Sequence, residues 1–193
     1  MIDRELKRSL GRLVEGVQVV AATHGGVTRA YCSHWVSQVS FAEPLVMASV
    51  SPKHDTHPLI AAAGWFSVSL LAGDQVEAGQ YFSYPGRRFR YVADEHLVTA
   101  PDGTPYVDGC IAWLRCEVVD RIDALGGRPG IERLPLDHEL VFARVTAAGQ
   151  GRLDEPALLY SSRRGWRVEG ERAREAGPSG RGKEATCQPA SGP

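Results

Sequence analysis

The chain has 193 residues, of which 43% are hydrophobic and 23% are charged, a composition typical of one globular domain with or without a tail. Its 22 Lys and Arg residues balance 23 Asp and Glu residues, so no basic face is indicated for nucleic acid. No apolar run approaches the ~20 residues that span a bilayer, and the N-terminal segment lacks a signal-peptide core. We therefore expect a cytoplasmic protein without nucleic-acid or membrane partners.

The four cysteines indicate neither a disulfide framework nor a metal site, because none of them forms a CxxC pair. Cys110 and Cys116 share an expected strand, where their spacing separates them by roughly 20 Å, beyond the reach of a disulfide. Reduced thiols fit a cytoplasmic protein best. The cysteine and histidine spacings match no common zinc site, and His54 and His57 have no evident third ligand, so no metal is expected.

The first expected element is an amphipathic helix over residues 2–15, where apolar side chains recur at helical spacing between charged ones. It should end before Gly16, where the pattern becomes β-branched. Residues 17–23 and 27–32 then predict the two strands of a hairpin, with a turn at His24-Gly25-Gly26.

Strands predominate in the rest of the chain. Residues 45–51 (LVMASVS) are mostly apolar, which predicts a strand buried on both faces. The other expected elements are strands at 65–71, 111–122, 138–146 and 158–160 and helices at 55–63 and 74–82. Because strands and helices do not alternate strictly, a doubly wound parallel sheet is disfavoured. We expect a mainly β, antiparallel, closed or nearly closed barrel with peripheral helices.

The composition changes at Glu169. Residues 169–193 consist largely of Gly, Pro, Ser, Ala and charged residues, without an aromatic side chain. Such a segment buries too little apolar surface to offset the entropy of ordering it. The sequence therefore predicts one domain over residues 1–168 and a disordered tail over 169–193.

Two neighbouring segments combine polar side chains with strand-like patterns. Residues 31–44 (YCSHWVSQVSFAEP) fit either an edge strand with one solvated face or the lining of a site for a planar polar ligand. Residues 49–56 (SVSPKHDT) join a strand end to a helix start, where backbone N–H groups attract anions. A phosphate site and simple helix capping both remain open there.

Two later segments also carry candidate functional residues. Residues 80–91 (QYFSYPGRRFRY) hold three arginines and five aromatic residues, which fits a nucleotide ligand or a surface turn whose aromatic rings pack inward. Asp137 and His138 open an expected strand. A histidine in this position can donate a hydrogen bond or move a proton near a ligand, or it can be merely structural.

The order and spacing of these segments resemble the flavin reductase-like family, whose fold is the FMN-binding split barrel. The resemblance runs from about Leu10 to Arg167. The resemblance rests on the following motifs, in chain order: Gly16-Val17-x-Val19-Val20, Ser33-x-Trp35-Val36-Ser37-Gln38-Val39-Ser40-Phe41, Pro44-Leu45-Val46, Thr56-x-x-Leu59-Ile60, Gly64-x-Phe66-x-Val68, Phe82, Arg88-Phe89, Ala112-Trp113-Leu114-x-Cys116-x-Val118-Val119, Asp137-His138 and Leu158-Leu159-Tyr160.

The resemblance implies a homodimer that binds FMN or FAD near the dimer interface. Residues 33–40 would contact the flavin ring, and the turn that begins at Ser51 would hold the phosphate end. His138 would lie on the nicotinamide side and is the candidate catalytic residue. The implied cofactor-binding residues are Ser33, His34, Trp35, Val36, Ser37, Gln38, Ser40, Ser51, Lys53, Thr56, Arg88 and Phe89.

The implied activity is that of an NAD(P)H:flavin oxidoreductase, which transfers hydride from NADH or NADPH to FMN or FAD and supplies reduced flavin to a partner monooxygenase. The alternative is a flavin-binding or electron-transfer protein without its own nicotinamide-dependent activity. Two departures from the family pattern motivate that alternative: His34 stands where serine is common, and Leu136 stands where glycine usually precedes the Asp-His pair. Two further departures are Cys32, where threonine or serine is common, and the segment 126–136, which is longer than usual.

Overall fold

The computed structural model describes residues 3–83, 96–126 and 132–170. Strands predominate in these ranges, and three helices accompany them. The helices are α1 (Arg4–Leu10), α2 (Thr56–Ala63) and α3 (Val76–Ser83). The strands are β1 (Glu15–Gly16), β2 (Gln18–His24), β3 (Val27–Ser33), β4 (Val36–Gln38), β5 (Leu45–Val50), β6 (Trp65–Leu70), β7 (Leu97–Thr99), β8 (Pro105–Val107), β9 (Ala112–Leu125), β10 (Leu134–Gln150), β11 (Leu158–Ser161) and β12 (Gly165–Val168).

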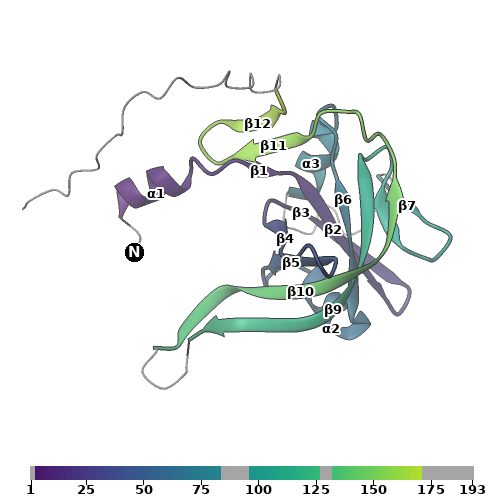
Figure 1. Ribbon diagram of the computed structural model, residues 1–193, viewed down its shortest axis with the longest axis horizontal. Coiled ribbons are helices and arrows are strands. Elements are labelled where there is room, and N and C mark those ends of the chain that lie inside the picture. The colour runs from purple at the N-terminus through teal and green to yellow at the C-terminus, as the bar shows by residue number, and fades with distance from the viewer. Residues whose placement is uncertain (1–2, 84–95, 127–131, 171–193) are drawn as a thin grey trace, which may run out of the picture.

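The main sheet has seven strands in the order β3-β2-β6-β9-β10-β5-β4, and all its ladders are antiparallel. It curls into an incomplete barrel with the helices at its periphery (Figure 1). Its two edge strands, β3 and β4, follow one another in the chain, and no ladder joins them in the part of the chain that the structure describes. The predicted fold class, a mainly β antiparallel split barrel, is confirmed.

Two apolar clusters form because successive strand residues point to opposite sides of the sheet. On β2, Val20 and Ala22 face the first cluster, with α2 over it, whereas Val19 and the residue just before the strand, Val17, belong to the second, with α3. The first cluster fills the inside of the curl and includes the fully buried Phe66. The second cluster includes Leu71 and Leu158 and lies between the sheet, α3 and the small sheet β1-β11-β12.

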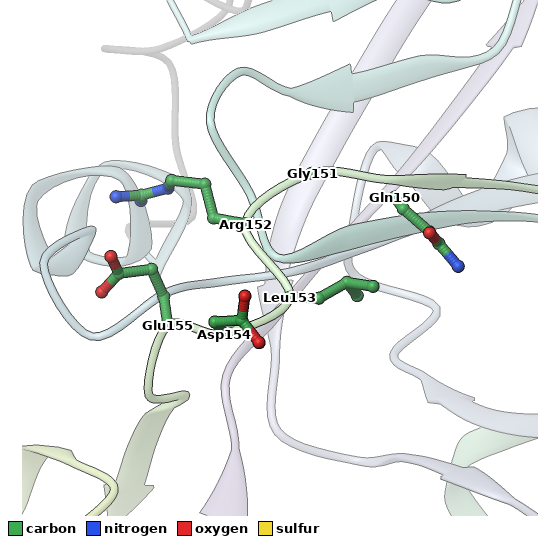
Figure 2. A pocket seen from close by; sticks show the side chains of 6 residues that line it. All are labelled: Gln150, Gly151, Arg152, Leu153, Asp154 and Glu155. Carbon is green, nitrogen blue, oxygen red and sulfur yellow. The ribbon is translucent and has the colours of Figure 1, made fainter.

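Short backbone bonds attach this small sheet to the barrel. The amide of Val17 donates to the carbonyl of Leu158 at 2.8 Å, and that of Leu158 donates to Leu71 at 2.9 Å. Residues 150–155, which precede β11, line a shallow surface hollow (Figure 2). Arg152 reaches from this loop to both carboxylate oxygens of Asp74 at 2.7 Å. The hollow contains none of the predicted site residues. The ion pair of Arg152 with Asp74 stabilises the loop that lines it.

Several predicted elements differ from those observed. The helix expected over 2–15 ends at Leu10, because Gly11 caps it, and the apolar side chains of α1 are exposed rather than buried. The strand at 45–51 is not buried on both faces. Its side chains alternate between buried and half-buried, because β5 lies at the side of an antiparallel barrel and not in a parallel sheet covered by helices.

The hairpin at Gly25-Gly26 is confirmed, and both glycines have positive φ, 57° and 76°, as a tight two-residue turn requires. The strands expected at 111–122 and 138–146 are longer in the structure and form the β9–β10 hairpin, which extends beyond the barrel (Figure 1). Residues 171–193, most of the predicted tail, lie outside the described residues. No described helix is long and apolar enough to cross a membrane.

Candidate functional site

Three segments singled out from the sequence lie side by side in the barrel, because β4, β5 and β10 are neighbours in the sheet. Ser49 of β5 is paired with Leu140 of β10, and its amide donates to the carbonyl of Trp35 at 2.9 Å. Residues 33–38, residues 49–56 and the start of β10 therefore meet at one place. The sequence alone did not establish this neighbourhood.

Trp35 and His138 are brought into contact across β5. Their ring centroids are 5.1 Å apart, with an edge-to-face angle of 69°. Trp35 precedes Val36, which packs against the inner cluster, so Trp35 points to the outer face of the sheet. The indole is 52% exposed and leaves its surface open to a ligand. The Nδ1 atom of His138 lies 3.0 Å from Asp137 Oδ1.

His34 does not fill the space beside Trp35. Its imidazole stacks on Tyr160 of β11, with ring centroids 4.3 Å apart and planes at 10°, and meets Trp166 edge-on at 6.0 Å. Burial lowers the pKa of His34, which favours the neutral ring. The imidazole therefore forms part of the contact between the β3–β4 connection and the small sheet, instead of blocking the expected flavin segment.

The turn between β5 and α2 forms a second part of the site. Ser51 and Thr56 are buried, whereas Lys53 is exposed. The Ser51 hydroxyl accepts a hydrogen bond from the Lys53 amide at 3.3 Å, and the Ser51 carbonyl accepts one from the His54 amide at 3.0 Å. His54 packs edge-on against Tyr31, with ring centroids 4.3 Å apart. An exposed ammonium group beside a tight turn at a helix start suits an anionic group.

The other predicted binding residues are placed less uniformly. Ser37 and Gln38 are exposed at the sheet edge. The side-chain amide of Gln38 (Nε2) donates a hydrogen bond to the backbone carbonyl of Ser40 at 2.9 Å, so these polar groups stabilise their own loop. Val36 points into the inner cluster and can contact a ligand on the outer face only through its backbone. Arg88 and Phe89 lie outside the described residues.

Sequence reasoning missed three residues that connect to this region, His57, Glu139 and Arg121. Oε2 of Glu139 accepts hydrogen bonds from His57 Nε2 at 2.9 Å and from Arg121 Nη2. The sequence showed His57 only as one of two histidines without a third ligand, and Arg121 carried no signal, because α2, β9 and β10 meet only in the folded chain. The one available signal was the position of Glu139 directly after His138.

Two of the buried polar atoms that have no hydrogen-bond partner among the described residues belong to neighbours of Ser33, one in the ladder and one in the chain. Gln18, whose Oε1 is one of them, is paired with Ser33 in the β2–β3 ladder. The other is Nδ1 of the next residue, His34. Unpaired buried polar atoms are rare in proteins, so their presence here fits a polar planar ligand that offers both donors and acceptors, as a flavin ring does. The residues present therefore fit the group.

The described residues contain no group of three His, Cys, Asp or Glu side chains arranged to hold a metal ion. Cys32, Cys110 and Cys116 are free thiols, which agrees with the expectation that Cys110 and Cys116 do not form a disulfide. Burial raises the pKa of Cys32 to about 11 and that of Cys116 to about 12. These protonated thiols are therefore poor nucleophiles.

The sequence pattern of the flavin reductase like domain matches residues 10–167. The chain belongs to this family. The match covers the barrel, the small sheet and all three segments that meet at Trp35 and His138. As a flavin reductase-like domain, the chain is expected to bind flavin.

Two curated relatives are reductase components of monooxygenases. The 4-hydroxyphenylacetate 3-monooxygenase reductase component of Thermus thermophilus is 33% identical, over 81% of this chain and 91% of that protein. The 4-nitrophenol 4-monooxygenase/4-nitrocatechol 2-monooxygenase reductase component of Rhodococcus opacus is 28% identical, over 83% and 79%. A diflavin flavoprotein of Synechocystis is 28% identical, and the chain spans only 24% of its length.

Solved structures agree with this fold. The NADH:FAD oxidoreductase SgcE6 of Streptomyces globisporus, in complex with NAD and FAD fragments, superposes with a TM-score of 0.70 at 24% identity. The match covers 92% of this chain and 99% of that chain. At this identity the likeness supports the fold alone.

Proposed function

We propose that this flavin reductase-like domain is an NAD(P)H:flavin oxidoreductase. The observation that carries the proposal is the contact between Trp35 and His138 across β5. It joins the segment expected to hold the flavin ring to the histidine expected on the nicotinamide side. Two relatives that match most of the chain, named as monooxygenase reductase components, support the same reaction.

A bound FMN or FAD would supply the redox chemistry, accepting hydride from NADH or NADPH. The protein's part is to bind and orient. Trp35 offers an exposed indole for stacking, Lys53 offers a positive charge for a phosphate, and His138 offers an imidazole within reach of a ligand on Trp35. Because hydride transfer needs no strong general base, the reaction requires of the protein only that it bind and orient its ligands.

We infer that the protein works as a homodimer. Apolar side chains are exposed on the part of the β9–β10 hairpin that extends beyond the barrel, namely Leu125 at 46% and Leu134 at 54%. Figure 1 shows no other element alongside this part. A two-stranded ribbon without a packing partner is marginally stable in water, and a second copy would cover it.

We further propose that reduced flavin passes to a flavin-dependent monooxygenase, since both relatives are named as reductase components of monooxygenases. The three free cysteines of the described ranges, two of them buried, suit a reducing compartment, so we propose a cytoplasmic location.

The test is oxidation of NADH and NADPH by the purified protein, with FMN or FAD added separately and absorbance followed at 340 nm. Oxidation faster than in the protein-free control supports the proposal, and the preferred pair identifies donor and cofactor. A protein that binds flavin but does not accelerate oxidation of either donor is a flavin-binding or electron-transfer module. A protein that takes up neither flavin contradicts both functions.

A further inference from the structure

The pairing of β10 with β9 is irregular at the start of β10, in the stretch that contains His138. Pro135 is paired with Ala124 and Leu140 with Ile122, so four residues, 136–139, stand opposite the single residue Asp123 of β9. On the other side of the strand, only Glu139 of these four is paired with β5. Bulges of this kind redirect side chains and are common beside active sites. Backbone pairing alone therefore constrains His138 weakly.

The side chain of Glu139 bridges this irregular stretch. Its Oε2 atom accepts hydrogen bonds from Arg121 Nη2 of β9 and from His57 Nε2 of α2, the latter at 2.9 Å. Arg121 is itself paired with Val141, just beyond the bulge. One carboxylate thus connects the start of β10 to the paired stretch 120–122 of β9 and to the first turn of α2.

The Glu139–Arg121 ion pair and the neighbouring His57 are largely shielded from water. The side chains of Glu139, His57 and Arg121 are 16%, 24% and 27% exposed. Burial by itself raises the pKa of Glu139, but the hydrogen bonds and charges of Arg121 and His57 outweigh it, so the pKa lies below its usual value. Glu139 is therefore ionised at neutral pH, and removing it leaves the Arg121 charge partly buried and uncompensated.

From this geometry we propose that Glu139, held by Arg121, is a positioning residue for His138. The bulge at residues 136–139 turns the His138 ring toward Trp35. The Glu139–Arg121 ion pair keeps the bulge in a single conformation. The consequence for turnover rests on the proposed function, because only there does His138 act on the nicotinamide side. The placement of the ring itself does not rest on it.

The chain offers a matched control on the same strand. Arg144 of β10 bonds Glu43 at 3.2 Å, and both side chains are more than half exposed. Arg144 lies in a part of β10 that is paired on both sides, with Leu45 and Glu117. Losing this ion pair should therefore leave His138 unchanged, whereas losing the Glu139–Arg121 pair should not.

The first experiment uses the flavin-free protein and records the imidazole signals of His138 by ¹H–¹³C NMR, assigned with His138→Gln. We expect Glu139→Ala and Arg121→Ala to shift or broaden these signals and Arg144→Ala to leave them in place. Glu139→Gln keeps the side-chain shape and an oxygen that can accept a hydrogen bond. It should therefore shift the His138 signals in the same direction as Glu139→Ala, but by a smaller amount. If Glu139→Ala does not fold, Glu139→Gln carries the test.

The second experiment measures turnover with saturating flavin. Because misplacing a reacting group by about 1 Å costs on the order of 100-fold, we expect Glu139→Ala to lower kcat by about 10- to 100-fold, with flavin Kd within about twofold. Arg121→Ala/Glu139→Ala should lose no more than either single variant, since both remove the same interaction.

The positioning role is overturned if the His138 signals are unchanged in folded Glu139→Ala. If the alanine variant does not fold, unchanged signals in Glu139→Gln overturn it. Additive losses of turnover in the double variant overturn it as well. If the unsubstituted protein oxidises neither nicotinamide, the proposed function fails, and the NMR result alone decides the inference.

Discussion

Trp35 packs edge-on against His138, with ring centroids 5.1 Å apart, although the two residues lie in distant parts of the chain. β5 makes this contact possible, because it separates β4 from β10 by a single strand. Two residues that the sequence assigned to different roles, ring binding and the nicotinamide side, thus share one surface. The first prediction follows from this contact.

Replacing His138 by alanine should lower turnover more than flavin affinity. The imidazole meets Trp35 at its edge and leaves the remaining indole surface free for a ligand, so flavin should still bind. We expect kcat to fall about tenfold or more, with Kd for flavin changed by less than about twofold. Stopped-flow kinetics and a fluorescence titration measure the two quantities. Equal losses in both would make His138 a structural residue.

Replacing Lys53 by alanine should weaken flavin binding mainly at low salt. Lys53 is exposed at the β5–α2 turn, so its attraction for a phosphate acts through water and is screened, with a Debye length of about 10 Å at 0.1 M salt. We expect about a fivefold rise in Kd at 10 mM salt and little change at 0.5 M. Equal affinities of the variant and the parent at both salts would remove Lys53 from the site.

Replacing His34 separates its packing from its polar role. Substitution by serine removes the stack on Tyr160 and should lower the free energy of unfolding by about 1 kcal/mol. Substitution by phenylalanine keeps an aromatic ring there but removes the unpartnered Nδ1. If Nδ1 binds flavin, His34→Phe keeps its melting temperature and loses affinity. Full affinity in His34→Phe would show that His34 only supports the fold.

Stability should decrease as the pH falls below about 6.5, the usual pKa of histidine. Burial lowers the pKa values of His34 and His54 in the folded state. Between the lower folded values and the unfolded value, the unfolded chain binds more protons, so acid favours unfolding. Urea unfolding at pH 7.5 and 5.5 measures this loss, which should be smaller in His34→Phe. An equal loss in His34→Phe would exclude His34 as a contributor.

Ending the chain after Gly170 should leave the fold intact. β12 pairs with β11 up to Val168, and the amide of Glu169 still donates to the carbonyl of Ala157 at 2.9 Å. A chain that keeps these bonds should melt within about 2 °C of the full chain, because surface changes seldom exceed about 0.5 kcal/mol. A large drop in Tm would show that the predicted tail over 169–193 contributes to the domain.

Local patterns predicted most elements of the barrel. β2, β3, β6 and α2 lie within a residue or two of their expected bounds, because alternation of apolar residues and glycine turns act over short stretches of chain. The patterns failed where the outcome depends on a neighbour. Short strands such as β4 exist only because β5 offers them a ladder, and the apolar side chains of α1 are exposed although their spacing is that of an amphipathic helix.

For the site, the sequence by itself determined which residue types were available: a tryptophan in a polar segment, a lysine before a helix and a histidine near the start of a strand. The tertiary structure decided that these meet on β4, β5 and β10, that His34 turns to Tyr160, and that Glu139 bridges a bulge to Arg121. Such contacts depend on strand order and register, which arise from the packing of the whole barrel and not from any local stretch of chain.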